Sequence, residues 1–307
     1  MTADLQRSVL TYDVGGSHVS AAVCQGGAYR LGPVVSAQYP AEQSSDAFVN
    51  LLYALGVEAS ARFTGVSGAE IAMPGPFDFS AGISRMRHKL PYLYGVDLRQ
   101  LVAQRFGWEG CQVRFLKDAA AFLLGEIGAG AARGVSRTVG ITLGTGIGSA
   151  FAVNGRLVTE GPGVAPGGEI WNLPYEGGIV EDALSTRAIQ REYEHRTGVI
   201  PEVARIAAAA GDDPNAEAVF TDFGHHLGVA LRTILAQFAP QVVVLGGGIS
   251  RSAHLFLPAA QSHLADLGVQ LVVSALKDNA PLVGAAVEWF NTTPRAIDSP
   301  APGATQS

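Results

Sequence analysis

The sequence contains little cysteine. Only two of its 307 residues are cysteines, Cys24 and Cys111, and they lie far apart, each within a strand-like run. Two such residues cannot build a disulfide framework, and neither forms the CxxC pair typical of metal or redox sites. We therefore interpret both as buried free thiols in a reducing cytoplasm.

Long apolar runs and an excess of basic residues are also lacking. No run approaches the roughly 20 apolar residues of a membrane span, and the N-terminal MTADLQRS lacks the features of a signal peptide. The formal net charge is −6, and the Lys and Arg residues are scattered, which disfavours binding to the phosphates of DNA or RNA. These absences predict a soluble cytoplasmic protein with no membrane partner and no nucleic-acid partner.

Glycine, by contrast, is abundant and marks two similar segments. Residues 8–31, SVLTYDVGGSHVSAAVCQGGAYRL, have the pattern of a strand, a glycine turn and a second strand. Residues 137–158, RTVGITLGTGIGSAFAVNGRLV, repeat this order and add a turn at Asn154-Gly155. The length suits two domains, and the chain is predicted to consist of two halves that each begin with a β-hairpin around a glycine loop.

Strands alternate with helices over the rest of the chain, which indicates an α/β fold. Residues 292–307, rich in Pro, Ser, Thr and Ala, show no periodicity and are predicted to form a disordered tail. Apolar spacing and turn residues predict further strands at 66–73, 241–248 and 269–276, and helices at 47–62, 97–107, 181–198, 216–238 and 277–290.

The glycine loops are the first candidates for a binding site. In DVGGS (13–17) and LGTGIGS (143–149), missing side chains would let backbone N–H groups approach an anion such as phosphate, although glycine also forms plain tight turns. A P-loop and a Rossmann loop are disfavoured, because no GxxxxGK[ST] occurs and GTGIGS leads into a strand. We expect phosphate between the two loops, Mg²⁺ on Asp13 directly or through water, and ribose and adenine near Gly246, Gly247 and Gly248, which end a parallel strand.

Asp118 has two interpretations. It stands between the strand-like FLK and an alanine-rich helical run, a position typical of a helix N-cap. A carboxylate fixed at a helix start could also accept the proton of a hydroxyl that attacks a phosphate. Lys117 directly precedes it.

The order of the motifs resembles that of the ROK family of bacterial sugar kinases and sugar-responsive repressors. The motifs are DVGGS, PGP (74–76), Asp118 ahead of an alanine-rich helix with GE, GTGIG with a following NG, GGE (167–169) and GGGIS (246–250). The resemblance runs from about Leu10 to about Phe290. It implies the two-domain actin-like ATPase fold, a duplicated ribonuclease H-like unit. The expected domains are a small one, 1–117 joined by the C-terminal helix at about 282–291, and a large one, 118–281.

The resemblance also implies an ATP- and Mg²⁺-dependent hexose kinase, similar to glucokinase and forming a homodimer, with Asp118 as the general base. It further implies a set of binding residues. Those expected to bind the sugar are Pro74, Gly75, Lys117, Glu169, Asn172 and Glu181, and those expected to bind ATP are Asp13, Gly15, Gly16, Ser17, Gly144, Thr145, Gly146, Gly246, Gly247 and Gly248.

The chain departs from the family pattern at three points. The zinc-binding cysteines are missing and Asn172 replaces the zinc histidine, so we expect no zinc site and an altered contact to the sugar. Lys117 replaces an asparagine that binds the sugar. Three roles of the Lys117 side chain are open: it points away from the cleft, it donates to a sugar hydroxyl, or it selects an anionic sugar. The role of Lys89 is open in the same way.

These departures leave open which sugar is used and whether polyphosphate replaces ATP. The alternative function is a catalytically weakened sugar-binding protein. A repressor is disfavoured, because only a dozen residues precede Asp13, too few for a helix-turn-helix.

Overall fold

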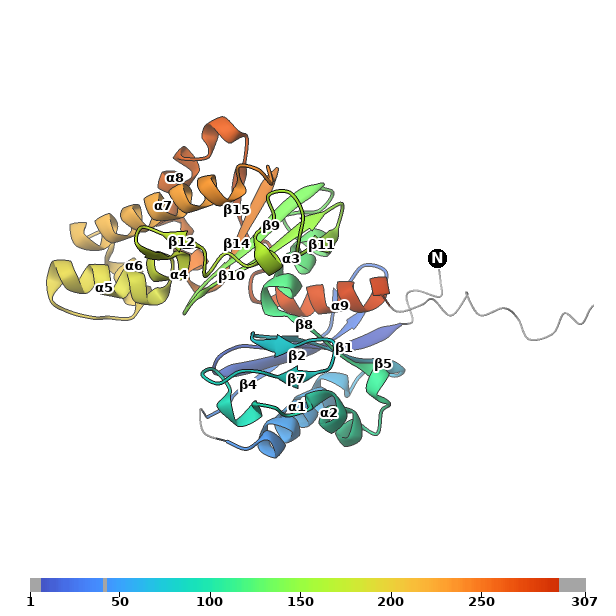
Figure 1. Cartoon of the computed structure of the whole chain (residues 1–307). Coiled ribbons are helices and arrows are strands. Elements are labelled where there is room, and N and C mark those ends of the chain that lie inside the picture. The colour runs from blue at the N-terminus through green and yellow to red at the C-terminus, as the bar shows by residue number, and fades with distance from the viewer. Residues whose placement is uncertain (1–6, 41–42, 293–307) are drawn as a thin grey trace, which may run out of the picture.

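Two β-sheets, one in each half of the chain, organise the molecule. The computed structural model describes residues 7–40 and 43–292, and Figure 1 shows the two sheets as separate bodies with α3 and α9 between them. The sheet of the first half has the order β3-β2-β1-β5-β8, with β4 also on β2. Its strands are β1 Ser8–Val14, β2 His18–Gln25, β3 Arg30–Leu31, β4 Val35–Gln38, β5 Val66–Met73 and β8 Val113–Lys117.

The sheet of the second half repeats the centre of the first. Its order is β11-β10-β9-β14-β15, so β9 pairs antiparallel with β10 and parallel with β14, as β1 does with β2 and β5. The predicted duplication and the turn at Asn154-Gly155 are confirmed, and both turn residues have the positive φ of a type I′ hairpin. The strands are β9 Arg137–Leu143, β10 Ile147–Val153, β11 Arg156–Val158, β14 Val242–Gly246 and β15 Gln270–Val273.

Helices cover both faces of each sheet. Successive residues of a strand point to opposite faces, so a strand that is apolar throughout must be covered on both sides. In β14, Val243 and Leu245 pack in the core that contains α7 and α8, whereas Val242 and Val244 pack against Phe122 of α3. The helices are α1 Ser45–Ser60, α2 Leu98–Phe106, α3 Asp118–Ala129, α4 Val180–Ala183, α5 Thr186–Thr197, α6 Val203–Ala209, α7 Pro214–Leu235, α8 Ala253–Ser262 and α9 Ala280–Thr292. Two small hairpins complete the fold, β6 Phe77–Asp78 with β7 Ile83–Ser84, and β12 Pro174–Tyr175 with β13 Gly178–Ile179.

The helices α3 and α9 cross between the two sheets (Figure 1). They approach closely at glycines, since a Cβ on Gly284 would lie 1.7 Å from the carbonyl oxygen of Ala121 and one on Gly125 would lie 2.0 Å from that of Ala280. Buried Glu126 holds the turn before α9, accepting hydrogen bonds from Ser274 Oγ at 2.5 Å and from the Leu276 amide at 3.0 Å. The helices thereby connect the two halves.

Several expectations need correction. Cys24 is buried in β2, but Cys111 is exposed in a short 3₁₀ helix, Gly110–Gln112, because its segment turns before β8 begins. The predicted helix at 181–198 is two helices, α4 and α5, broken at Leu184 and Ser185. Thr292 ends α9, and the rest of the predicted tail lies outside the described residues.

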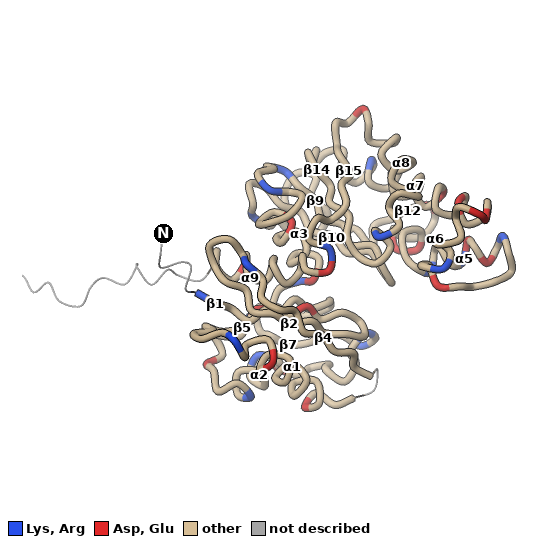
Figure 2. The backbone as a smooth tube through the Cα atoms, turned by 180° about the vertical axis from the view of Figure 1, so that it is seen from behind, with Lys and Arg blue, Asp and Glu red and all other residues tan. Residues whose placement is uncertain are grey.

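Charged residues of both signs are spread along the described part of the chain. Lys and Arg are interspersed with Asp and Glu over both halves (Figure 2). Within residues 7–40 and 43–292, no helix is both long and apolar enough to cross a membrane. The exact boundary between the domains, at 117/118, stays a prediction.

Candidate active site

The glycine loops of both halves line one cavity of about 620 Å³. It lies where β1, β8, β9 and β14 end, and the carboxyl ends of strands in open α/β sheets are the usual place for a ligand. The predicted site residues that line it are Gly15, Gly75, Lys117, Asp118, Gly144, Thr145, Gly146, Glu169, Glu181 and Gly247. The fold thus brings together residues that the sequence separates by more than 200 positions.

Asp118 is the first residue of α3. The N-cap position belongs to Lys117, whose side chain makes no capping bond, so the interpretation of Asp118 as the N-cap is wrong. Its Oδ1 accepts a hydrogen bond from the Ala119 amide at 2.7 Å. Burial raises the pKa of Asp118, although that hydrogen bond and the charges of Lys89 and Lys117 act in the opposite direction. The carboxylate is therefore fixed, faces the cavity and is a stronger base than an exposed aspartate.

Lys117 lies in the cavity, at the end of β8. Its ammonium is 2.7 Å from Glu169 Oε1, and the side chain is 20% exposed. The first of its three predicted roles, pointing away from the cleft, is therefore wrong. Its ion-pair partner is Glu169, which leaves Asp118 free to accept a proton.

Glu169 also holds Trp171. The indole Nε1 donates to Glu169 Oε2 at 2.7 Å, and the ring lines the cavity with 39% of the residue exposed. Burial acts against the ionised carboxylate, but the hydrogen bonds from Lys117 and Trp171 and the charges of Lys117 and Lys89 lower the pKa of Glu169 overall. Glu169 therefore stays ionised and fixes a cation and an aromatic ring at the same end of the cavity.

Glu181 lies at the other side, against the second glycine loop. Its Oε2 accepts a hydrogen bond from the Ile147 amide at 3.2 Å, and Arg187 lies 3.6 Å from its Oε1. A Cβ on Gly146 would come within 2.2 Å of this carboxylate, so a larger residue there would displace the Glu181 side chain. Glu181 therefore contacts the predicted phosphate loop as well as the cavity.

The second loop has the properties of an anion site. A Cβ on Gly144 would meet nothing within 4 Å, so the space beside it is open for a ligand. Within the described residues, the amides of Thr145 and Gly146 donate to no other group. Unpaired amides at a glycine loop bind anions, and these suit the phosphates of a nucleotide.

Asp13, at the end of β1, fits a divalent cation. Burial and the negative charges of Asp118 and Asp278 raise its pKa to about 7, so its ionised form needs a compensating positive charge. Mg²⁺ commonly binds one or two carboxylates together with substrate phosphates and water, and a single aspartate beside a phosphate loop suits that pattern.

Some predicted residues do not line the cavity. Asn172 is exposed, Pro74 is buried after β5, and Gly246 is buried beneath Phe122. Four other predicted residues lie within two positions of a lining residue without lining the cavity themselves, namely Asp13, Gly16, Ser17 and Gly248. Trp171, which sequence reasoning missed, lies next to Asn172, and its position two residues after Glu169 was the available signal.

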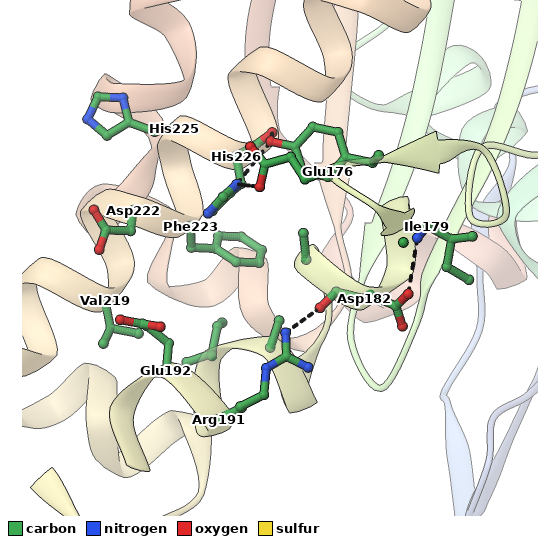
Figure 3. Close-up of a pocket in the computed structure, with 15 residues that line it drawn as sticks. Glu176, Ile179, Asp182, Arg191, Glu192, Val219, Asp222, Phe223, His225 and His226 are labelled. Atoms are coloured by element: carbon green, nitrogen blue, oxygen red, sulfur yellow. Dashed lines mark hydrogen bonds and ion pairs between the residues drawn. The ribbon is translucent and has the colours of Figure 1, made fainter. Parts of the chain in front are cut away.

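Another cavity, of about 410 Å³, lies between α4, α5 and α7 (Figure 3). Its charged groups are already paired within the protein. Arg191 donates to the carbonyl oxygen of Asp182 at 2.8 Å, and His226 Nδ1 lies 2.9 Å from Tyr175 Oη and 3.4 Å from Glu176. Asp222 and Glu192 share Arg196. The cavity at the glycine loops is therefore the better candidate for an active site.

The sequence model of the ROK family matches residues 9–291. The chain belongs to the ROK family. The glucokinase of Thermotoga maritima is 30% identical over 247 residues, covering 70% of this chain and 77% of that protein. The N-acetyl-D-glucosamine kinase of Pectobacterium atrosepticum is 28% identical over 266 residues, covering 80% and 85%. Both of these relatives are sugar kinases.

Solved ROK structures have the same fold. The ROK hexokinase from Thermus thermophilus has a TM-score of 0.75 at 26% identity, covering 91% of this chain and 97% of that one. The ROK glucokinase from Streptomyces griseus, crystallised with glucose and AMPPNP, has a TM-score of 0.75 at 24% identity, covering 91% and 98%, which is a likeness of fold alone. The predicted family and the two-domain actin-like ATPase fold are confirmed.

Proposed function

We propose that the protein is an ATP- and Mg²⁺-dependent kinase that phosphorylates a hydroxyl group of a hexose or hexose derivative. The observation that carries the proposal is that Asp118 shares one cavity with the two glycine loops and with Glu169. The similarity to glucokinase and to N-acetyl-D-glucosamine kinase supports a sugar as the acceptor. The homodimer stays a prediction.

The glycine loops bind ATP in this proposal. The amides of Thr145 and Gly146, which donate to no other described group, are offered to its phosphates, with Gly15 lining the cavity on the side of the first loop. Gly247 lies where the ribose and adenine would follow. Asp13 would hold Mg²⁺, which neutralises charge on the β- and γ-phosphates. Positioning and charge neutralisation supply most of what phosphoryl transfer requires.

Asp118 is the general base. The acceptor hydroxyl oxygen attacks the γ-phosphorus of ATP, and its proton passes to the Asp118 carboxylate. A new oxygen–phosphorus bond forms while the bond from the γ-phosphorus to the bridging oxygen breaks, and ADP leaves. The raised pKa of Asp118 favours its acceptance of the proton.

Glu169 and Trp171 orient the acceptor. The fixed carboxylate has lone pairs left for sugar hydroxyls, and the exposed indole face can stack on the apolar face of a pyranose. Closure of the two halves around the α3–α9 crossing would exclude water during transfer.

The first test is a coupled assay of ADP release with MgATP and a panel of sugars, for the wild type and Asp118→Asn. Loss of the base should lower kcat by about 10²–10⁴-fold on the sugar that is turned over. Asp212→Asn, which removes an exposed carboxylate far from the cavity, is the matched control and should leave kcat unchanged.

The rival function, sugar binding without catalysis, predicts a different result. No sugar would then stimulate ADP release, while one or more would raise the thermal midpoint of the wild type. That outcome would reject the kinase and retain the sugar site.

A further inference from the structure

Lys89 is a cation of the cavity that has no counter-ion among the described residues. Its side chain is exposed toward the cavity, and within the described part of the chain no carboxylate lies within 4 Å of its ammonium and no hydrogen bond engages it. Three other charged lining groups, Lys117, Glu169 and Glu181, differ in this respect. Lys117 pairs with Glu169, and Glu181 has Arg187 at 3.6 Å.

Lys89 acts on the part of the cavity that contains Asp118 and Glu169, which we call the acceptor end. Its positive charge is felt by both Asp118 and Glu169, the groups that would face the sugar. It is absent from the charges that act on Asp13, beside the first phosphate loop, where Asp118 and Asp278 dominate. The ammonium therefore lies near enough to the base and to Glu169 to act on both.

An unpaired ammonium suits a neutral sugar poorly. When the cavity closes around a neutral sugar, Lys89 would lose water while the sugar offers it no negative partner, and its charge would also make Asp118 less basic. An anionic group on the acceptor removes both disadvantages. The Lys117–Glu169 pair acts in the same sense, because it cancels a carboxylate that would otherwise repel an anion.

We infer that the acceptor is an anionic sugar derivative whose carboxylate or phosphate group forms an ion pair with Lys89. This inference rests on the proposed kinase function and names its substrate class. The anionic group takes no part in the transfer. A free hydroxyl of the same molecule attacks the γ-phosphorus, its proton passes to Asp118, and ADP leaves as before.

The test is the initial rate of ADP release with MgATP on neutral and anionic sugars. Glucose and N-acetylglucosamine are the neutral probes. Gluconate, glucuronate and N-acetylmuramate carry a carboxylate at different positions, and glucose 1-phosphate carries a phosphate. The probe that is turned over fastest therefore also identifies the anionic group and the position where it is attached to the sugar. We expect kcat/KM to be at least tenfold higher for one of the anionic probes than for either neutral sugar.

Lys89→Met then tests the residue. It should lower kcat/KM for the preferred anionic probe by roughly tenfold to a hundredfold, the usual effect of losing a hydrogen bond to a charged group, and raise its KM. The rates on neutral sugars should not fall, because removal of the charge leaves Asp118 more basic. Because Lys89 has no partner in the described structure, the thermal midpoint should not change. Arg85→Met, which removes a positive charge from the same exposed segment but not from the cavity, is the matched control and should behave as the wild type.

The alternatives give separate results. If no sugar of either kind stimulates ADP release, the proposed kinase function fails. If a neutral sugar is preferred, or Lys89→Met lowers the rates on neutral and anionic sugars equally, the kinase stands and the anionic acceptor is rejected. A rise in KM for ATP alone would assign Lys89 to the nucleotide and would also overturn the inference.

Discussion

Glu169 determines the shape of the acceptor end of the cavity. Its two oxygens accept from Lys117 and from Trp171, each at 2.7 Å, so one carboxylate fixes both a cation and an aromatic ring. A residue held by two such bonds has little freedom left, which is the condition for a preorganised site. The indole ring is therefore presented to the cavity in a defined position.

Replacing Trp171 tests its contact with the sugar. Trp171→Ala should raise the KM for the acceptor about tenfold, because roughly 1–1.5 kcal/mol of aromatic contact is lost. The KM for ATP should not change. Trp171→Phe keeps a ring but loses the N–H that donates to Glu169, so its KM should lie between those of the wild type and the alanine variant. Steady-state kinetics with both substrates varied would measure these effects, and an equal rise in both KM values would contradict the assigned contact.

For individual residues, the sequence predicts which side chains share the site but not which of them form hydrogen bonds or ion pairs with one another. Asp118 and Glu169 were expected in one site, and they line one cavity. The pairing of Lys117 with Glu169 joins positions 52 residues apart, and local patterns carry no information on such a contact. Asn172 and Trp171 are neighbours in the chain, and only the backbone direction at that point decides which of them faces the cavity.

Among the elements, β5 and β8 place a buried glutamate beside an arginine. Glu70 lies opposite Arg114 in the parallel register, is 1% exposed, and has its Oε2 2.9 Å from the guanidinium. Burial raises the pKa of Glu70 from its ordinary value of 4.5 to about 8, although Arg114 acts to lower it. The folded protein thus retains a proton on Glu70 at pH values where the unfolded chain has released it.

This difference makes stability depend on pH. The contribution of protonated Glu70 is complete below about pH 4.5 and is lost as the pH rises towards 8, with a slope of up to about 1.4 kcal/mol per pH unit. Glu70→Gln cannot titrate, so its stability relative to the wild type should increase from pH 5 to pH 8. Urea unfolding across this range measures the change, with the exposed Glu58→Gln as the control. If the free energies of unfolding of Glu70→Gln and the wild type changed with pH in the same way, Glu70 would not retain its proton in the folded protein.

Elements with strong periodicity could be predicted from the sequence, and their ends could not. The continuous apolar run of β14 and the 22-residue α7 were both expected. The break between α4 and α5 was missed, because Ser185 is a polar residue within a helical pattern and its burial, at 1% exposure, depends on tertiary packing.

For the molecule as a whole, the crossing of α3 and α9 connects the two halves. The helix α3 carries Asp118 at its first residue and packs on the second sheet, while α9 packs on the first. The duplication of hairpins could be read from the two glycine segments, but this crossing could not, since it joins residues about 160 positions apart through backbone contacts at glycine. Any relative movement of the halves must preserve or reshape this contact.

The contact can be tested at Gly284. A methyl group there would lie 1.7 Å from the Ala121 carbonyl oxygen, so Gly284→Ala must push the helices apart. Overpacking costs about 1–3 kcal/mol, and the thermal midpoint should fall by several degrees even though alanine favours a helix. Since the shift moves α3, and Asp118 with it, kcat/KM should fall as well. Gly211→Ala is the matched control, because a Cβ there meets nothing within 4 Å and the midpoint should stay the same or rise slightly. A Gly284→Ala protein with the midpoint and kinetics of the wild type would show that the helices do not cross at this distance in solution.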